Sequence, residues 1–170
     1  STLGMPAVRF FTEISEAHVL RPDGGDEIRF MFSANPNVSP QPVEKAASAG
    51  DISRIMLALK SIVARSAQLP TIIFDEIDTG VSGRIADATG RIIEDLGRNM
   101  QVVNITHLPQ VAAKGDTHFV VYKDDSSGTA RTSIRRLNAE ERIEEIAKML
   151  SGERITDSAV AQARVLLTRV

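Results

Sequence analysis

Apolar and polar residues alternate in two segments near the start of the chain, Val8 to Glu16 and Glu27 to Ser33. The segment between them contains the turn-forming run Arg21-Pro22-Asp23-Gly24-Gly25. Alternation on both sides of a turn predicts an antiparallel β-hairpin. Prolines recur in the next segment, residues 34–47, and exclude both a helix interior and a central strand there. We therefore expect a surface loop over 34–47.

Apolar residues then recur at helical spacing, which predicts a helix over residues 51–67. Ser48, followed three residues later by Asp51, fits a capping box at its start, and Pro70 marks its end. An amphipathic helix of this kind buries its apolar side. The residues expected on that buried face are Ile52, Ile55, Met56, Leu59, Ile62 and Val63.

A strand, a helix and a second strand follow, which predicts a βαβ unit with a parallel sheet at the core. The short apolar runs 71–74 and 101–105 are typical of strands that are covered on both faces. Between them, helical spacing is shown by Ile85, Ile92, Ile93 and Leu96. The fold class predicted from this order is α/β.

The last third of the chain predicts two further strands and two closing helices. The strands span residues 118–122 and 130–136, around a turn at 124–128. One helix follows Asn138, with Glu141 as its capping partner, and the other follows Thr156. Because no repeat or low-complexity tract divides the chain, we expect a single domain over residues 1–170 with helices flanking the sheet.

Composition narrows the possible classes of protein. The 170 residues carry a formal net charge of -2, which gives no global reason to expect nucleic-acid binding by this chain alone. The absence of cysteine excludes disulfides and thiolate metal sites and fits a reducing compartment. No apolar run is long enough to span a bilayer, and no signal peptide is recognisable. We therefore expect a soluble, cytoplasmic protein.

Polar residues that are suited to phosphate chemistry follow the two predicted parallel strands. Asp75 and Glu76 come directly after the first strand, and Thr106 and His107 after the second. Carboxyl ends of neighbouring parallel strands meet at one edge, where open α/β sheets bind ligands. An aspartate there can hold Mg²⁺, the adjacent glutamate can orient and deprotonate a water, and a histidine can donate to a phosphate oxygen. Alternatively, the two acids simply end a strand in solvent and the histidine is structural.

The phosphate-binding loop of such sites, GxxxxGK[ST], is absent from this chain. None of the five lysines follows a glycine. If the chain is part of an ATPase, its phosphate loop must therefore come from another segment or another chain.

Three motifs resemble the C-terminal part of the RecN family of bacterial DNA repair proteins. They are DISRIMLALK at 51–60, IFDEIDTGVSG at 73–83 and ITHLPQVA at 105–112. The resemblance also takes in LGMP at 3–6, FSANP at 32–36 and EEIAKMLSG at 144–152, so it covers nearly the whole chain. The spacing of the second and third motifs is far more specific than a strand followed by two acids.

The resemblance implies a P-loop NTPase fold of the ABC and SMC type, in which the ATPase head is split into two lobes. The Walker A loop lies in an N-terminal lobe, a long coiled coil follows, and this chain is similar to the C-terminal lobe. We therefore expect the missing N-terminal lobe with its coiled coil, a second head in an ATP-dependent homodimer, and DNA as partners. ATP and Mg²⁺ are the implied cofactors, DNA double-strand break repair the implied process, and the bacterial nucleoid the implied location.

The resemblance also implies roles for individual residues. Asp75 would be the Walker B magnesium ligand, Glu76 the residue that positions the hydrolytic water, and His107 the switch histidine that senses the γ-phosphate. The loop from Asp78 to Ser82 would cross the interface between two heads. The signature motif, which contacts ATP on the opposite head, would consist of Ser48, Ala49, Gly50 and Asp51.

The signature motif departs from the usual Ser-Gly-Gly-Glu at two positions, since Ala49 replaces the first glycine and Asp51 the glutamate. Alanine matters if that backbone needs a positive φ or a very close approach. Two further interpretations therefore remain open. One is a non-catalytic lobe that docks its partners, and the other is an independent Mg²⁺-dependent nuclease or phosphatase built on Asp75, Glu76, Asp78 and His107.

Overall fold

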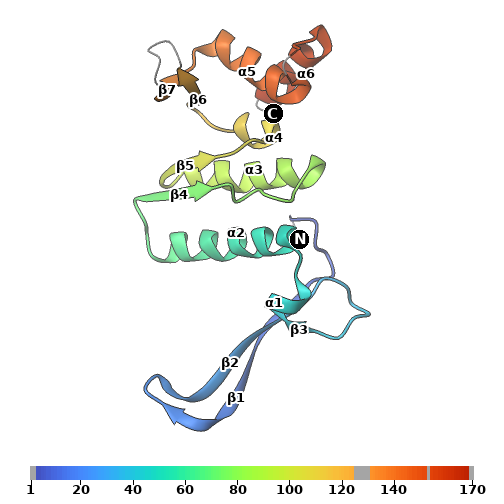
Figure 1. Ribbon diagram of the computed structural model, residues 1–170, viewed down its shortest axis with the longest axis vertical. Coiled ribbons are helices and arrows are strands. Elements are labelled where there is room, and N and C mark those ends of the chain that lie inside the picture. Colours follow the sequence, from blue (N-terminus) through green and yellow to red (C-terminus); the bar gives the residue numbers. More distant parts are fainter. Residues whose placement is uncertain (1–2, 125–130, 153, 169–170) are drawn as a thin grey trace.

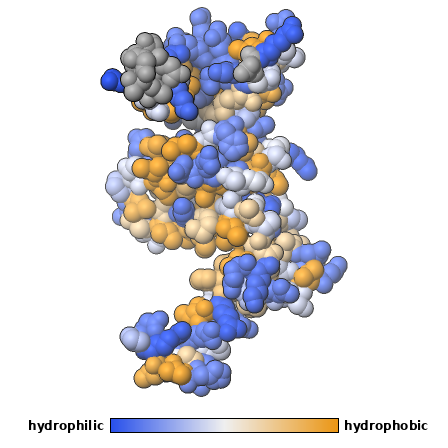
Figure 2. All heavy atoms as spheres, viewed as in Figure 1, coloured by the Kyte–Doolittle hydropathy of each residue, from blue (hydrophilic) through white to orange (hydrophobic). Residues whose placement is uncertain are grey.

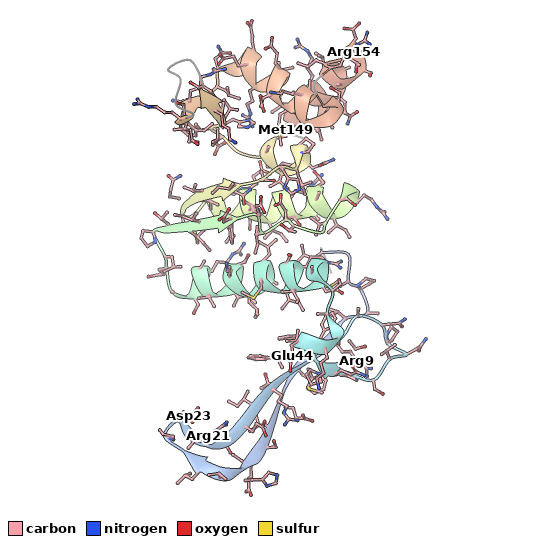
Figure 3. All side chains as sticks on the ribbon, in the orientation of Figure 1. Arg9, Arg21, Asp23, Glu44, Met149 and Arg154 are labelled. Carbon is pink, nitrogen blue, oxygen red and sulfur yellow. The ribbon has the colours of Figure 1, made fainter. Side chains whose placement is uncertain are left out.

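The computed structural model describes residues 3–124, 131–152 and 154–168, and its elements form a stack along one long axis (Figure 1). The hairpin β1 and β2 projects at one end, α2 lies above its base, the β4–β5 sheet with α3 comes next, and the C-terminal helices lie at the far end. In Figure 3, Arg21 and Asp23 mark the hairpin tip, while Met149 and Arg154 mark the opposite end.

The predicted hairpin is confirmed, with strands longer than the alternating pattern indicated. β1 (Arg9–Arg21) pairs antiparallel with β2 (Gly24–Ser33), which also pairs with β3 (Gln41–Pro42). Segment 34–47 is therefore not entirely a loop, because it contains β3 and the short α1 (Val43–Ala46). Arg9 fixes the base of the hairpin by donating to the Val38 carbonyl at 2.7 Å.

The predicted βαβ unit is confirmed. β4 (Thr71–Asp75) pairs in parallel with β5 (Gln101–Ile105), and α3 (Gly83–Gly97) connects them. The main apolar core joins this unit to α2 (Ala49–Ser66). Its buried members are Leu3, Leu57, Phe74, Ile93, Leu96 and Val111.

The prediction that both strands are covered on two faces was wrong. Ile72 and Val102 pack against the core, but Ile73 is 63% exposed, Val103 44% and Ile105 53%. Successive side chains in a strand point to opposite faces, and in-register partners of a parallel pair share a face. We call the second face, with Ile73, Asp75, Val103 and Ile105, the open sheet face, because no described segment packs over it.

The expected burial of the apolar side of α2 was also wrong. Its buried residues are Leu57, Ser61 and Ala64. Five of the six residues predicted to be buried, Ile52, Met56, Leu59, Ile62 and Val63, are instead exposed. The helical period was correct, but the side facing the described chain is the one with the smaller residues. Figure 2 shows apolar side chains gathered on the surface of the middle layers of the stack.

The C-terminal elements follow the predicted order. α4 (Pro109–Ala112) leads to β6 (Phe119–Asp124), which pairs antiparallel with β7 (Arg131–Arg136). The predicted turn after Asp124 lies outside the described residues. α5 (Ala139–Ser151) begins with the predicted capping box of Asn138 and Glu141, and α6 (Asp157–Leu167) is capped by Thr156. Both helices pack in a second apolar cluster around Ile146. Among the described residues, no helix meets the length and apolarity that crossing a membrane requires.

Candidate functional site

Asp75 and Glu76 lie at the shared edge of the parallel strands. Asp75 is the last residue of β4 and pairs in register with Ile105, the last residue of β5. The Glu76 N–H donates to the Ile105 carbonyl at 3.1 Å, and Glu76 takes a left-handed backbone with φ of 47°. Both acidic side chains are exposed. A non-glycine residue at positive φ is strained, and such strain gathers at functional turns.

The residues after β5 lie beside this turn, as the strand order predicted. The Thr106 hydroxyl donates to Oδ2 of Asp78 and accepts from the Leu108 N–H at 2.9 Å. His107 lies between these two anchored residues and is exposed. Pro109 then starts α4, where its missing N–H costs no helical hydrogen bond. The structure thus brings the loops of Glu76 and His107 together at one edge.

Asp78 differs from the other acids because its side chain is buried, with 1% exposed. Its Oδ2 accepts from Thr106, and its Oδ1 has no hydrogen-bond partner among the described residues. A buried carboxyl group does not reach a metal ion or a phosphate in solvent. In this structure the Asp78 carboxylate is turned toward Thr106 and away from solvent.

The loop after β4 turns back onto the start of α2. Thr79 donates its N–H and its hydroxyl to the Glu76 carbonyl, at 3.1 and 2.8 Å, and Gly80 has φ of 79°. A Cβ atom placed on Gly50 would lie 2.8 Å from the Gly80 carbonyl oxygen, closer than real Cβ contacts allow. The loop and the start of α2 are therefore in backbone contact. Ser82 ends the loop as the exposed N-cap of α3, where its side chain makes no capping hydrogen bond.

The start of α2 carries the predicted capping box. The Ser48 Oγ accepts from the Asp51 N–H at 3.2 Å, and Asp51 Oδ2 accepts from the Ser48 N–H at 3.1 Å and from its hydroxyl at 2.7 Å. Ala49 is the first helical residue and is not among the residues with positive φ. The alanine is thus accommodated without backbone strain, and the close approach falls on Gly50 instead.

Arg54 completes the helix start, and the sequence motifs alone did not single it out. It donates to Asp51 Oδ1 at 2.5 Å, to the Gly50 carbonyl at 3.0 Å and to the Leu3 carbonyl at 3.2 Å. The first two contacts agree with helical i, i+3 and i, i+4 spacing, a signal that was present in the sequence. The contact with Leu3 spans 51 residues and needed the fold.

The segment that follows His107 is held to α3 by an ion cluster at Lys114, two residues after the end of α4. Asp87 accepts from Arg91 at 2.9 Å and pairs with Lys114 at 3.1 Å. Burial alone would raise the pKa of Asp87, but the hydrogen bonds from Lys114 and Arg91 outweigh it and hold that pKa below its usual value. The segment with His107 is thereby anchored at both of its ends.

A hollow of about 660 Å³ lies apart from this edge, between β7 and the start of α5. His118 on its wall has a pKa below the usual 6.5, because burial disfavours the charged imidazole and Arg142 adds like charge, partly opposed by Glu145. Arg135 on the same wall pairs with Glu141 at 2.6 Å. None of the residues predicted to bind a nucleotide lines this hollow.

The residues at the strand edge fit a nucleotide with Mg²⁺. Asp75 offers exposed carboxylate oxygens, the ligand type that Mg²⁺ prefers. The first turn of α2 has backbone N–H groups without intrahelical acceptors, and these attract anions. Among the described residues, no three His, Asp or Glu side chains are grouped as a complete metal site.

Solved structures with the same arrangement of elements are SMC heads. One was solved in a study of the ATP-driven dimerization and DNA-stimulated activation of SMC ATPases. It aligns with a TM-score of 0.62 at 15% identity, over 88% of this chain and 85% of that chain. The Smc head domain with a coiled coil from Pyrococcus yayanosii aligns with a TM-score of 0.65 at 19% identity, over 88% of this chain and 27% of that chain. The fold is thus that of an SMC-type head, of the P-loop NTPase class.

Sequence similarity is more specific. DNA repair proteins RecN of Halalkalibacterium halodurans and Vibrio cholerae are 42% and 40% identical over 94% and 97% of this chain, and that of Mycobacterium leprae is 45% identical over 85%. The chain covers 28%, 30% and 24% of these relatives. Over the segment that it spans, the chain is similar to DNA repair proteins of the RecN type along most of its length. No protein-family model matches it.

Proposed function

We propose that this chain is the C-terminal lobe of a RecN-type ATPase head, which binds and hydrolyses ATP between two heads during DNA double-strand break repair and recombination. The proposal rests on the contact between the carboxyl edge of the β4–β5 sheet and the start of α2. Asp75, Glu76 and His107 follow neighbouring parallel strands, and the same loop touches the start of α2 at Gly50.

In this proposal the strand-edge residues act on ATP bound to their own head. Asp75 holds Mg²⁺, which neutralises phosphate charge when it is bound. Glu76, exposed directly after the magnesium ligand, orients the attacking water and accepts its proton. His107 donates a hydrogen bond to the γ-phosphate oxygen from the end of the next strand.

The start of α2 acts on ATP bound to the opposite head. Its first-turn N–H groups and the positive end of the helix dipole attract the γ-phosphate. Ser48 adds a hydroxyl by turning it from Asp51 Oδ2, to which it donates in this structure, to the phosphate. Asp51 serves indirectly, because its contacts with Ser48 and Arg54 hold the turn in place. Ala49 and Gly50 provide the surface that the phosphate approaches, and Ser82 closes the loop that crosses the interface between heads.

The N-terminal lobe docks on the open sheet face in this proposal. This face carries Ile73, Val103 and Ile105 in contact with water, together with Asp75. Exposed apolar patches of this kind mark interaction surfaces. A Walker A loop brought to this face would lie beside the magnesium ligand, which is what a shared ATP site requires. DNA, the coiled coil and a cytoplasmic, nucleoid-associated location belong to the complete protein in this proposal.

A non-catalytic docking lobe is the second candidate, and the exposed apolar side of α2 favours it. Replacing Glu76 decides between the two. In the complete protein, Glu76→Gln should abolish hydrolysis and trap an ATP-bound dimer, visible by size-exclusion chromatography with light scattering. Glu144→Gln, at a glutamate on α5 that is exposed like Glu76, is the matched control. Hydrolysis at the wild-type rate in Glu76→Gln would remove the catalytic role and leave the docking lobe.

A further inference from the structure

The Thr106 hydroxyl joins the two loops that carry Glu76 and His107. It donates to Asp78, two residues after Glu76, and accepts from the N–H of Leu108, the residue directly after His107. A threonine hydroxyl has one proton to donate. That proton is therefore committed to the β4 loop, while the oxygen holds the turn after β5.

The Asp78 end of this contact lies inside the protein. Asp78 is 1% exposed, and Thr106 is the only side chain that donates to it among the described residues. Water does not readily replace a hydrogen bond at such a site, and an unpaired buried polar group is costly. Breaking this contact would leave both carboxyl oxygens of Asp78 without a donor, so the pair favours the observed arrangement, which sets the distance between the loops.

We propose that Thr106 and Asp78 are positioning residues for hydrolysis, whose hydrogen bond fixes Glu76 and His107 relative to each other. This inference rests on the proposed function. Neither residue needs to contact ATP, because Thr106 acts through the backbone at Leu108 and Asp78 through the turn after Glu76. Displacing a reacting group by about 1 Å costs on the order of 100-fold in rate, so a lost hydroxyl at this point is expected to lower turnover.

The test compares three threonine variants in the complete protein. Thr106→Val keeps the shape but removes the hydroxyl, Thr106→Ser keeps the hydroxyl, and Thr89→Val is the matched control. Thr89, on α3, is 1% exposed and so more buried than the half-buried Thr106, and its hydroxyl has no hydrogen-bond partner among the described residues. Removing that hydroxyl therefore breaks no described contact.

We expect Thr106→Val to lower kcat by about 10- to 100-fold while the KM for ATP and ATP-dependent dimerisation in a Glu76→Gln background stay within about twofold. Thr106→Ser and Thr89→Val should stay close to wild type. Hydrogen–deuterium exchange without nucleotide provides a second readout. The Leu108 amide should exchange at least about tenfold faster in Thr106→Val, because its acceptor is lost.

Three results would overturn the inference. They are a kcat within twofold of wild type in Thr106→Val, an equal loss in Thr89→Val, or a loss of kcat accompanied by lost dimerisation and a lowered melting temperature. Asp78→Ala, which removes the acceptor of the Thr106 hydroxyl, is judged by the same criteria and decides if Thr106→Val does not fold. Glu76→Gln distinguishes a failure of the proposed function from a failure of this inference. Continued hydrolysis in Glu76→Gln would refute the proposed function. A normal rate in Thr106→Val alone would refute only the positioning role of Thr106 and Asp78.

Discussion

Gly50 and Gly80 are in backbone contact, such that a Cβ atom on Gly50 would lie 2.8 Å from the Gly80 carbonyl oxygen. The contact joins the start of α2 to the loop that follows β4. In the proposed head dimer, the start of α2 serves one ATP and the residues after β4 serve the other. The two ends of the proposed site are therefore in direct contact within each chain.

Gly50→Ala should weaken the protein at this contact. The obstacle is backbone rather than a flexible side chain, and overpacking of this kind costs about 1–3 kcal/mol. We expect a lower melting temperature and, in the complete protein, ATP-dependent dimerisation weakened by about tenfold or more, since 1.4 kcal/mol corresponds to a factor of ten. Light scattering against ATP concentration measures it.

Two variants serve as controls for Gly50→Ala. Gly97→Ala, on α3, meets nothing within 4 Å and should dimerise as wild type. Ala49→Gly should also change little, because Ala49 adopts an ordinary helical backbone. A large gain in dimerisation on Ala49→Gly would contradict this and show that the alanine methyl keeps the nucleotide away.

Arg54 should contribute to stability through the helix start. Its side chain is 15% exposed, and that of its partner Asp51 is 14% exposed. Arg54→Gln would remove the positive charge that pairs with the Asp51 carboxylate and the donor to the Leu3 carbonyl. Hydrogen bonds to charged groups contribute about 1.5–3 kcal/mol, so we expect the free energy of unfolding to fall by roughly 2 kcal/mol in urea titration.

Arg91→Gln is the matched control for Arg54. Arg91 also pairs with an aspartate on its own helix, but its side chain is 70% exposed. Exposed ion pairs of this type contribute about 0–1 kcal/mol. Equal losses in the two variants would show that the contacts with Leu3 and Gly50 add nothing.

His118 should make the stability of the protein depend on pH. Its pKa is lowered by burial and by Arg142 from the usual 6.5, so the folded protein takes up its proton at a lower pH than the unfolded chain. Because the unfolded state binds more protons in that interval, this contribution is present above pH 6.5 and is lost as the pH falls through the folded pKa. An NMR titration of the His118 imidazole checks the direction, and a midpoint at or above 6.5 would contradict it.

Local patterns were sufficient to predict most elements of this fold. The capping box of Ser48 and Asp51, the parallel strands before Asp75 and His107, and both closing helices follow from spacing over a few residues. The side of an element that is buried did not follow from spacing. Ile73 and Ile62 are apolar but exposed, as expected of residues that another surface covers. A periodic pattern predicts that such residues are covered, but it does not distinguish a surface of the same chain from that of a partner.

The contacts that connect the site were the least predictable from the sequence. The pairing of Asp78 with Thr106 spans 28 residues, and that of Arg54 with Leu3 spans 51. Gly50 and Gly80 contact each other only because β4 and α2 lie in adjacent layers. Each of these contacts depends on the assembled fold, whereas the exposed residues Asp75, Glu76 and His107 stood out through their motifs.

The open sheet face should be required for assembly with the rest of the protein. Ile73 lies at its centre and is 63% exposed, so a charge there costs this chain little but would be buried against a docked lobe. We expect Ile73→Glu to abolish copurification with a separately expressed N-terminal lobe, while the circular dichroism spectrum of this chain is unchanged. Ile134→Glu on β7 is the matched control, since Ile134 is 65% exposed and lies in a different sheet. Binding of the lobe to Ile73→Glu as tightly as to Ile134→Glu would place the docking surface elsewhere, with the exposed side of α2 as the next face to test.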